Sequence, residues 1–188
     1  MNIRKILART WYFIWKDDSL LSWIVNIILA FVITKFLIYP GLGLVLGTTH
    51  PVVAVVSGSM VHDAGFDEWW SRNSQFYMDY GVSEEKFKGF IFKNGFNKGD
   101  IIVLKTPKDI NIGDVIVFKG NSQNPIIHRA IQIDNGKIIT KGDHNLQADP
   151  VPVDSASVIG KSLFKIPYLG WVKIIFVDSL QTIGVNIS

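Results

Sequence analysis

Histidine and serine are the residues of this 188-residue chain best suited to acid–base or nucleophilic chemistry, because the sequence contains no cysteine. Without cysteine there is no thiol nucleophile, no disulfide and no cysteine-ligated metal. A serine hydroxyl becomes a useful nucleophile only when a neighbouring base takes its proton. The base must be near in space but is free in chain position, so each of the four histidines is a candidate.

The segment Ser57-Gly58-Ser59-Met60 is the candidate source of a nucleophile. It directly follows an apolar, β-branched run, Pro51 to Val56, which predicts a short buried strand. Gly58 allows a tight turn, so two hydroxyls would emerge where the strand ends. Ser-Gly pairs are also ordinary turn residues, and the segment alone is weak evidence for a site.

The four histidines differ in their surroundings. His128 alternates with apolar residues in PIIHRAI, a pattern that is also typical of a histidine satisfied within the core. His62 follows Ser59 by three residues, but closeness in sequence does not aim its ring at the hydroxyl. His50 and His144 are predicted to lie in loops.

A histidine base needs a carboxylate to orient it, and Asp143 and Asp149 are the candidates. Both lie in the polar stretch KGDHNLQADP, where plain turn chemistry explains them equally well. No HExxH or comparable ligand spacing occurs, so the sequence predicts no metal site and no cofactor.

An apolar segment precedes these residues, SLLSWIVNIILAFVITKFLIY at 19–39. As a helix it would span about 31 Å, close to the hydrocarbon thickness of about 30 Å, and Pro40-Gly41 is expected to end it. Basic residues precede the span, whereas 40–71 contains no Lys or Arg. The positive-inside rule therefore predicts a cytoplasmic N-terminus and an outer domain. The stretch is too long for a cleaved signal peptide and no A-x-A site follows, so we expect a single-pass anchor in the plasma membrane.

The chain from Lys98 onward consists of short β-rich segments separated by turn residues. KGDIIVLK at 98–105 and IGDVIVFK at 112–119 predict two similar strands, and Asn135-Gly136 predicts a hairpin between two more. ASVIGKSLFKI predicts a further strand. The fold class expected is mostly β, with an N-terminal transmembrane helix followed by an antiparallel β domain.

Four segments are expected: a cytoplasmic N-terminus at 1–18, the anchor at 19–39, an extracytoplasmic domain at 40–165 and a membrane-proximal apolar tail at 166–188. The domain contains an aromatic-rich, partly helical insertion at 63–97, which is either a packed subdomain or an interfacial element. The apolar tail is expected to form either a helix at the membrane interface or a last element packed on the domain. The alternative is a second transmembrane helix. The net charge of +3 without a long basic run argues against nucleic-acid binding.

The sequence resembles the signal peptidase I family, in its archaeal and endoplasmic-reticulum branch. The resemblance lies in segments that follow one another in the family's order: the anchor, VVSGSM, KGDIIVL, PIIHRA, KGDHN and ADP. The similarity covers about residues 20–170, and the insertion resembles that of methanogen-type archaeal enzymes. It implies a membrane-bound serine endopeptidase that removes signal peptides from secreted preproteins. Its partners would be signal peptides, the lipid bilayer and the translocation machinery.

The resemblance also implies roles for individual residues. Ser59, the serine directly before Met, would be the nucleophile, and His128 would be the general base where the bacterial branch has lysine. Asp149 would be the triad carboxylate, with Asp143 as a structural support. The oxyanion hole would use the Ser59 N–H with the Ser57 hydroxyl, and an extended peptide would add to Val52–Val56 with residues 102–104 opposite.

Two other functions fit parts of the sequence. One is a non-catalytic, membrane-anchored β module that captures extended peptides within a secretion complex. The other is a self-cleaving regulator of the same broad fold, a class that pairs serine with lysine and carries a DNA-binding domain. The histidine at position 128 and the absence of such a domain from this sequence disfavour the second.

Overall fold

The computed structural model describes residues 3–120 and 125–182 and separates into two units, one up to Val45 and one from Leu46 onward. Residues 1–2, 121–124 and 183–188 lie outside the described residues. Residues 1–2 belong to the predicted cytoplasmic N-terminus, 121–124 to the predicted extracytoplasmic domain and 183–188 to the predicted tail. What was predicted for these residues therefore lies outside the described part of the chain.

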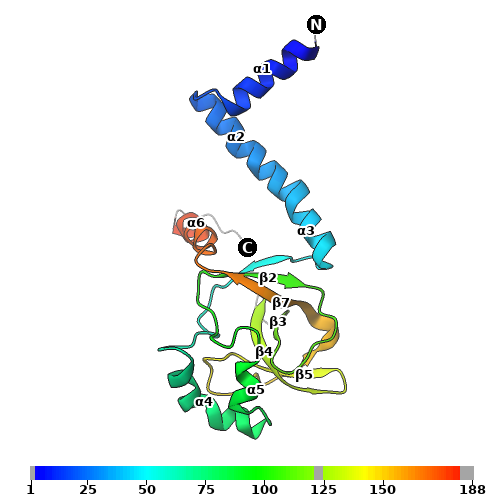
Figure 1. Cartoon of the computed structure of the whole chain (residues 1–188), viewed down its shortest axis with the longest axis vertical. Helices are drawn as coiled ribbons and strands as arrows, with labels where there is room; N and C mark the ends of the chain where they lie inside the picture. The colour runs from blue at the N-terminus through cyan, green and yellow to red at the C-terminus, as the bar shows by residue number, and fades with distance from the viewer. Residues whose placement is uncertain (1–2, 121–124, 183–188) are drawn as a thin grey trace. The chain divides into compact units, whose positions relative to one another are not determined.

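The first unit is helical (Figure 1). It contains α1 (Ile3–Trp15) and α2 (Leu20–Ile33), which Ser19 caps by accepting the Ser22 N–H. A π-helical turn, η1 (Thr34–Ile38), and α3 (Tyr39–Leu46) continue α2 without a break. Leu20–Leu46 is thus one apolar run of 27 residues, and of the described helices it alone is long and apolar enough to cross a membrane.

The prediction that Pro40-Gly41 ends this helix is wrong. Proline lacks an N–H and its ring crowds the carbonyl of the preceding turn. The π-helical turn directly before Pro40 widens the helix, and within it the Tyr39 N–H bonds to the Thr34 carbonyl five residues back. The helix instead ends before Gly47, whose φ of +66° lies in the left-handed region that glycine adopts readily.

The second unit is built on a curved seven-stranded sheet in the order β1-β2-β7-β3-β4-β5-β6, with every pairing antiparallel (Figure 1). The strands are β1 (Val52–Ala54), β2 (Ile101–Lys105), β3 (Val115–Phe118), β4 (Ile126–Asp134), β5 (Lys137–Lys141), β6 (Val153–Asp154) and β7 (Val158–Ile166), with a short 3₁₀ turn, η2 (Ser155–Ser157), before β7. The predicted mostly β, antiparallel fold is confirmed.

The hairpin predicted at Asn135-Gly136 connects β4 and β5. Asn135 and Gly136 have φ values of 46° and 78°, so both central residues are left-handed, as a type I′ turn requires. Because the turn fixes the register, β4 presents alternate residues to opposite faces of the sheet. His128 and Arg129 therefore point in opposite directions from adjacent positions.

The insertion folds into α4 (Phe66–Asp79) and α5 (Glu84–Lys88). Its aromatic side chains pack with each other and against β4 and β5 in one hydrophobic cluster, whose buried members are Trp69, Trp70, Tyr77, Val82, Phe87 and Ile131. Trp69 and Trp70 are only 2% and 7% exposed. Of the two readings of the insertion, the structure therefore favours a packed subdomain over an interfacial element.

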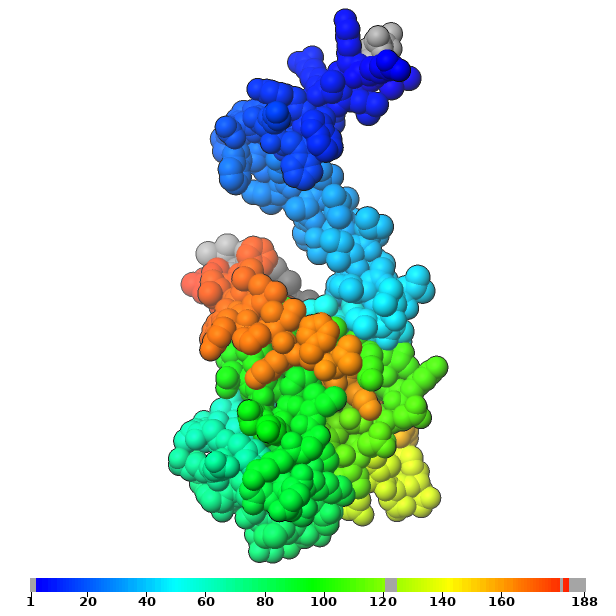
Figure 2. Space-filling model, viewed as in Figure 1, coloured from blue at the N-terminus to red at the C-terminus, as the bar shows by residue number. Residues whose placement is uncertain are grey.

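The described part of the tail contains α6 (Trp171–Thr182), which forms part of the surface of this unit in orange and red in Figure 2. Twelve residues of helix are about 18 Å long, too short to cross a bilayer. The start of α6 is docked through the Gly170 N–H, which donates to the Gly99 carbonyl at 2.8 Å. The Trp171 indole covers Gly99 so closely that a Cβ there would clash.

Candidate active site

Ser59 lies in the loop after β1, and backbone hydrogen bonds fix that loop on both sides. Before the serine, the Val55 N–H donates to the Asp100 carbonyl at 2.9 Å. After it, the Phe96 N–H donates to the Met60 carbonyl at 3.0 Å. The carbonyl of Ser59 itself accepts the His144 N–H at 2.8 Å. The serine therefore sits on a constrained backbone although its loop is partly exposed.

His128 is held on β4 opposite Ile116 of β3 and is only 7% exposed. Its Nδ1 lies 2.7 Å from Oδ2 of Asp149. Since an ionised carboxylate only accepts hydrogen bonds, this contact assigns the proton to Nδ1 and leaves Nε2 as the free, basic nitrogen. The arrangement fits a base that is oriented from behind by an acid.

Asp149 is fixed in turn by Thr140 of β5. The Thr140 hydroxyl donates to the same Oδ2 atom at 2.5 Å, and the Asp149 N–H donates to the Thr140 carbonyl at 2.8 Å. Burial alone would raise the pKa of Asp149, but the hydrogen bonds from His128 and Thr140 hold it below its ordinary value of 3.8. The carboxylate is therefore ionised and aimed at the imidazole near neutral pH.

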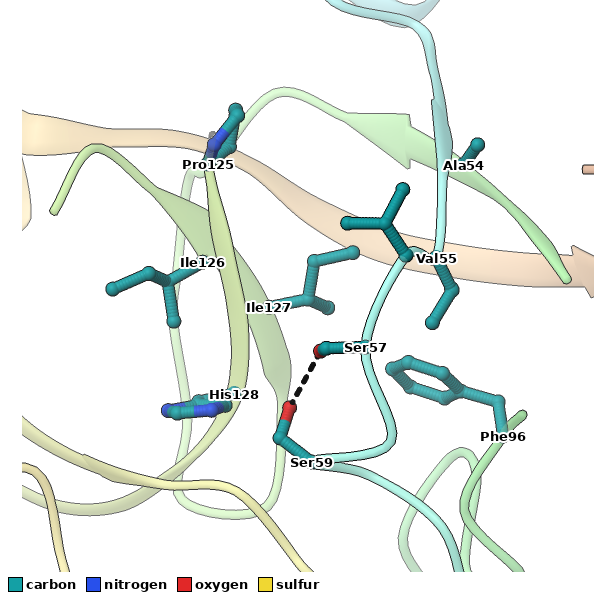
Figure 3. Close-up of a pocket in the computed structure, with 10 residues that line it drawn as sticks. Ala54, Val55, Ser57, Ser59, Phe96, Pro125, Ile126, Ile127 and His128 are labelled. Carbon is teal, nitrogen blue, oxygen red and sulfur yellow. Dashed lines mark hydrogen bonds between the residues drawn. The ribbon is translucent and has the colours of Figure 1, made fainter. Parts of the chain in front are cut away.

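Ser59 and His128 face each other across one pocket (Figure 3). The Ser59 hydroxyl is 3.3 Å from the Ser57 hydroxyl, and no direct hydrogen bond joins Ser59 to His128 in this structure. Gly142 lies beside both, because a Cβ on it would be 2.8 Å from the Ser59 carbonyl oxygen and 2.9 Å from His128 Nε2. In unliganded sites such catalytic contacts are often long and tighten only when substrate binds.

Asp143 does not touch His128. It is fully buried, and Arg129 holds both of its oxygens through Nε at 2.9 Å and Nη2 at 2.6 Å. Burial alone would raise the pKa of Asp143, but Arg129 and a hydrogen bond from His62 hold it far below its usual range. This geometry is that of a structural support, and of the two candidate carboxylates Asp149 is the one in contact with His128.

The other histidines lie away from the serine hydroxyl. His62 is stacked on Trp69 with ring centroids 3.7 Å apart, and its Nε2 contacts Asp143 at 2.9 Å. His50 bonds to the neighbouring Thr49 hydroxyl, and His144 pairs with Asp63 at the surface. Among the described residues, no three His, Asp or Glu side chains are grouped as a metal site requires.

The pocket around the serine has a volume of about 280 Å³. One wall is the chain from Ala54 to Ser57, Phe96 forms part of the lining, and Pro125 to His128 form the facing wall (Figure 3). The expectation that residues 102–104 lie opposite a bound peptide is wrong, because Ile102 and Val103 pair directly with β1. The facing wall is instead the start of β4.

Arg129 and Thr140 were missed as members of this site. Arg129 follows His128 in an apolar strand, and a fully buried arginine needs a buried partner. An arginine inside a strand pattern was therefore a usable signal. Thr140 gives no comparable signal, because threonine is an ordinary strand residue.

Fold and geometry together define a β-sheet domain with a candidate serine hydrolase site. No family model matches the chain, and no solved structure matches it. The chain is 28% identical over 160 residues to the signal peptidase complex catalytic subunits SEC11C of Homo sapiens and Mus musculus, covering 77% of this chain and 67% of theirs. It is 23% identical over 171 residues to the catalytic subunit SEC11 of Fusarium vanettenii, covering 82% and 81%.

The same similarity extends to the catalytic subunit sec11 of Pyrenophora tritici-repentis, at 26% identity over 158 residues, 76% of this chain and 72% of that one. These relatives support a similarity of the chain to the endoplasmic-reticulum-type branch of the signal peptidase I family. The resemblance stated from the sequence motifs is confirmed to that level.

Proposed function

We propose that this chain is a membrane-bound serine endopeptidase that removes N-terminal signal peptides from secreted preproteins through a Ser59–His128–Asp149 triad. The carrying observation is the 2.7 Å contact between His128 Nδ1 and Asp149, which leaves Nε2 free in the pocket that holds Ser59. The relatives, which are named as catalytic subunits of signal peptidase complexes, support the same activity.

In the proposed reaction, Ser59 Oγ attacks the scissile carbonyl carbon while His128 Nε2 takes its proton. The oxyanion would be bound by the Ser59 N–H and the Ser57 hydroxyl, which already lies beside the nucleophile. His128 then gives the proton to the leaving amine, and an acyl-enzyme forms on Ser59. A water molecule, deprotonated by His128, hydrolyses this ester and restores the serine hydroxyl.

The substrate would lie extended between the two walls of the pocket. β1 pairs with β2 along one edge only and stands at the end of the sheet order, so its other edge is available to a peptide strand. The pocket lining is mostly apolar, from Ala54, Val55, Phe96 and Ile127 among others. Small apolar side chains of a signal peptide fit such a pocket.

The helix Leu20–Leu46 serves as the membrane anchor in this proposal. At about 40 Å it exceeds the hydrocarbon thickness of about 30 Å and would tilt. Basic residues Arg4, Lys5, Arg9 and Lys16 precede it, so the N-terminus would be cytoplasmic and the sheet domain outside the plasma membrane. Signal peptides and the translocation machinery would then be its partners at the outer surface.

The tail helix α6 would rest on the lipid surface. Val172, Ile175 and Phe176 lie on one helix face and are 70%, 60% and 62% exposed, with Lys173 beside them. The cysteine-free chain allows single labels at V172C and, as a control, at the 90% exposed Leu146 (L146C). In vesicles, a lipid-attached quencher should reach the label at 172 and not at 146; equal quenching would contradict this placement.

The activity is tested by incubating the purified full chain in detergent with a preprotein and sequencing the N-terminus of the product. The proposal expects a single cut directly after the signal peptide. Binding of the preprotein without any cleavage would favour the alternative, a non-catalytic peptide-binding module of a secretion complex.

A further inference from the structure

The insertion contacts the loop behind the active site through two polar groups that project from its aromatic cluster. The Trp69 indole N–H donates to the Asp143 carbonyl oxygen at 3.0 Å. The Tyr77 hydroxyl donates to Asp143 Oδ1 at 2.9 Å. Both groups belong to α4, and both are buried, with Tyr77 at 0% exposure. A buried hydroxyl and indole that meet on one residue tie α4 to that residue.

A buried lysine strengthens the same connection. Lys141 is fully buried, and its Nζ donates to the carbonyls of Gly142 and Asp143, both at 3.2 Å. The ammonium also lies over the rings of Phe76 and Tyr77, 5.0 and 5.1 Å from their centroids. Burial lowers the pKa of Lys141 to about 8. The insertion therefore contacts the loop through its rings as well as through hydrogen bonds.

The other side of this loop contacts the catalytic residues. His144, directly after Asp143, donates its N–H to the Ser59 carbonyl at 2.8 Å. Gly142, directly before it, is packed against the Ser59 carbonyl and His128 Nε2. The Asp143 N–H also donates to Met60 Sδ at 3.4 Å, next to the serine. Residues 142–144 thus separate the insertion from the nucleophile and its base by a single layer of backbone.

We propose that the insertion is a positioning device for the catalytic serine, and that Tyr77 and Trp69 act as positioning residues through the 142–144 loop. This inference rests on the proposed peptidase activity. Since Ser59 and His128 have no direct hydrogen bond in the unliganded site, their alignment depends on the backbone between and around them. A misplacement of about 1 Å at a catalytic group can cost about 100-fold in rate.

The test compares Tyr77→Phe with Tyr80→Phe in the full chain. The first removes only the hydroxyl that donates to Asp143 and keeps the ring in its cluster. The second makes the same chemical change at the end of α4, where the Tyr80 ring stacks on Phe76. We expect kcat to fall about 10- to 100-fold for Tyr77→Phe, with KM within about twofold, and no change for Tyr80→Phe. Trp69→Phe, which loses the indole N–H, should follow Tyr77→Phe.

Amide hydrogen exchange on the same proteins supplies a readout independent of turnover. The amide of His144 should exchange faster in Tyr77→Phe, whereas amides in β3 should exchange as in the wild type. If kcat per folded molecule is unchanged, or if kcat falls while the 142–144 amides keep their protection, the positioning role is wrong. If the wild-type chain cleaves no preprotein, the proposed function is wrong. In that case hydrogen exchange still tests the positioning role, which is wrong if the His144 amide exchanges at the same rate in Tyr77→Phe as in the wild type.

Discussion

The contact between Asp149 and His128 makes a prediction that distinguishes two substitutions at one position. Asp149 Oδ2 accepts two hydrogen bonds, from His128 Nδ1 at 2.7 Å and from the Thr140 hydroxyl at 2.5 Å. In Asp149→Asn, the amide oxygen can occupy the Oδ2 position and accept both bonds. The threonine hydroxyl favours this orientation, because it too must find an acceptor.

The asparagine variant would therefore keep the histidine tautomer and lose only the charge. A hydrogen bond to a charged group contributes about 1.5–3 kcal/mol and a neutral one about 0.5–1.5 kcal/mol. The difference of about 1–1.5 kcal/mol corresponds to a loss of about 5- to 13-fold in kcat. Asp149→Ala removes the acceptor entirely. We expect a loss of about 10²–10⁴-fold, approaching the effect of an incorrectly protonated histidine in Ser-His-Asp enzymes.

The assay is kcat and KM for cleavage of a synthetic preprotein by the full chain in detergent, normalised to folded protein. Asp134→Asn, the same charge change at the exposed far end of β4, is the matched control and should behave as wild type. If Asp149→Asn loses as much activity as Asp149→Ala, Thr140 does not set the amide orientation. If Asp149→Ala stays within about threefold of wild type, Asp149 does not orient the base.

Three further predictions follow from the same geometry. Gly142→Ala should fold but lose nearly all cleavage, because its Cβ would lie 2.8 Å from the Ser59 carbonyl and 2.9 Å from His128 Nε2; melting temperature and rate together check this, and near-normal turnover would contradict it. Asp143→Asn should lower the unfolding free energy by about 3–5 kcal/mol, because Arg129 loses its buried counter-charge. Because the pKa of Asp143 is lowered in the folded state, this residue stabilises the wild type fully above its ordinary pKa of 3.8, and the stabilisation is lost as pH falls below that value. In denaturant titrations at several pH values, the unfolding free energy of Asp143→Asn should therefore fall less steeply with acid than that of the wild type. An equally steep fall in both proteins would refute this. His128→Lys should fail to cleave, because Asp149, which the Thr140 hydroxyl fixes, accepts a hydrogen bond from a ring nitrogen that lysine lacks; full activity would show that histidine is not required.

The strands were predictable because their local signals agree with the final fold. The type I′ turn at Asn135-Gly136 indicates the pairing of β4 with β5, and the Gly-Asp turns mark where β2 and β3 begin. The end of the apolar helix was not predictable in the same way. Proline normally ends a helix, and only a widened π-helical turn, which has no clear sequence signature, carries this helix past Pro40.

The site was predictable in its residue types but not in its connections. Ser59, His128 and Asp149 were identified through ordered motifs, and the structure brings His128 and Asp149 into contact. The choice between Asp149 and Asp143 depends on which face of the hairpin each reaches, and spacing alone does not settle that. The contacts of Tyr77 and Trp69 with Asp143 join residues 66 and 74 positions apart, and aromatic composition predicts only that such residues pack together.

The nucleophile is the central claim, and Ser59→Ala tests it most directly. The variant should bind a preprotein and remain folded but release no mature product, whereas Ser71→Ala, at an exposed serine on α4, should cleave as wild type does. Sequencing the product N-terminus over time measures both. Loss of cleavage confined to Ser59→Ala is the result predicted, and mature product released by Ser59→Ala at the wild-type rate would contradict the account.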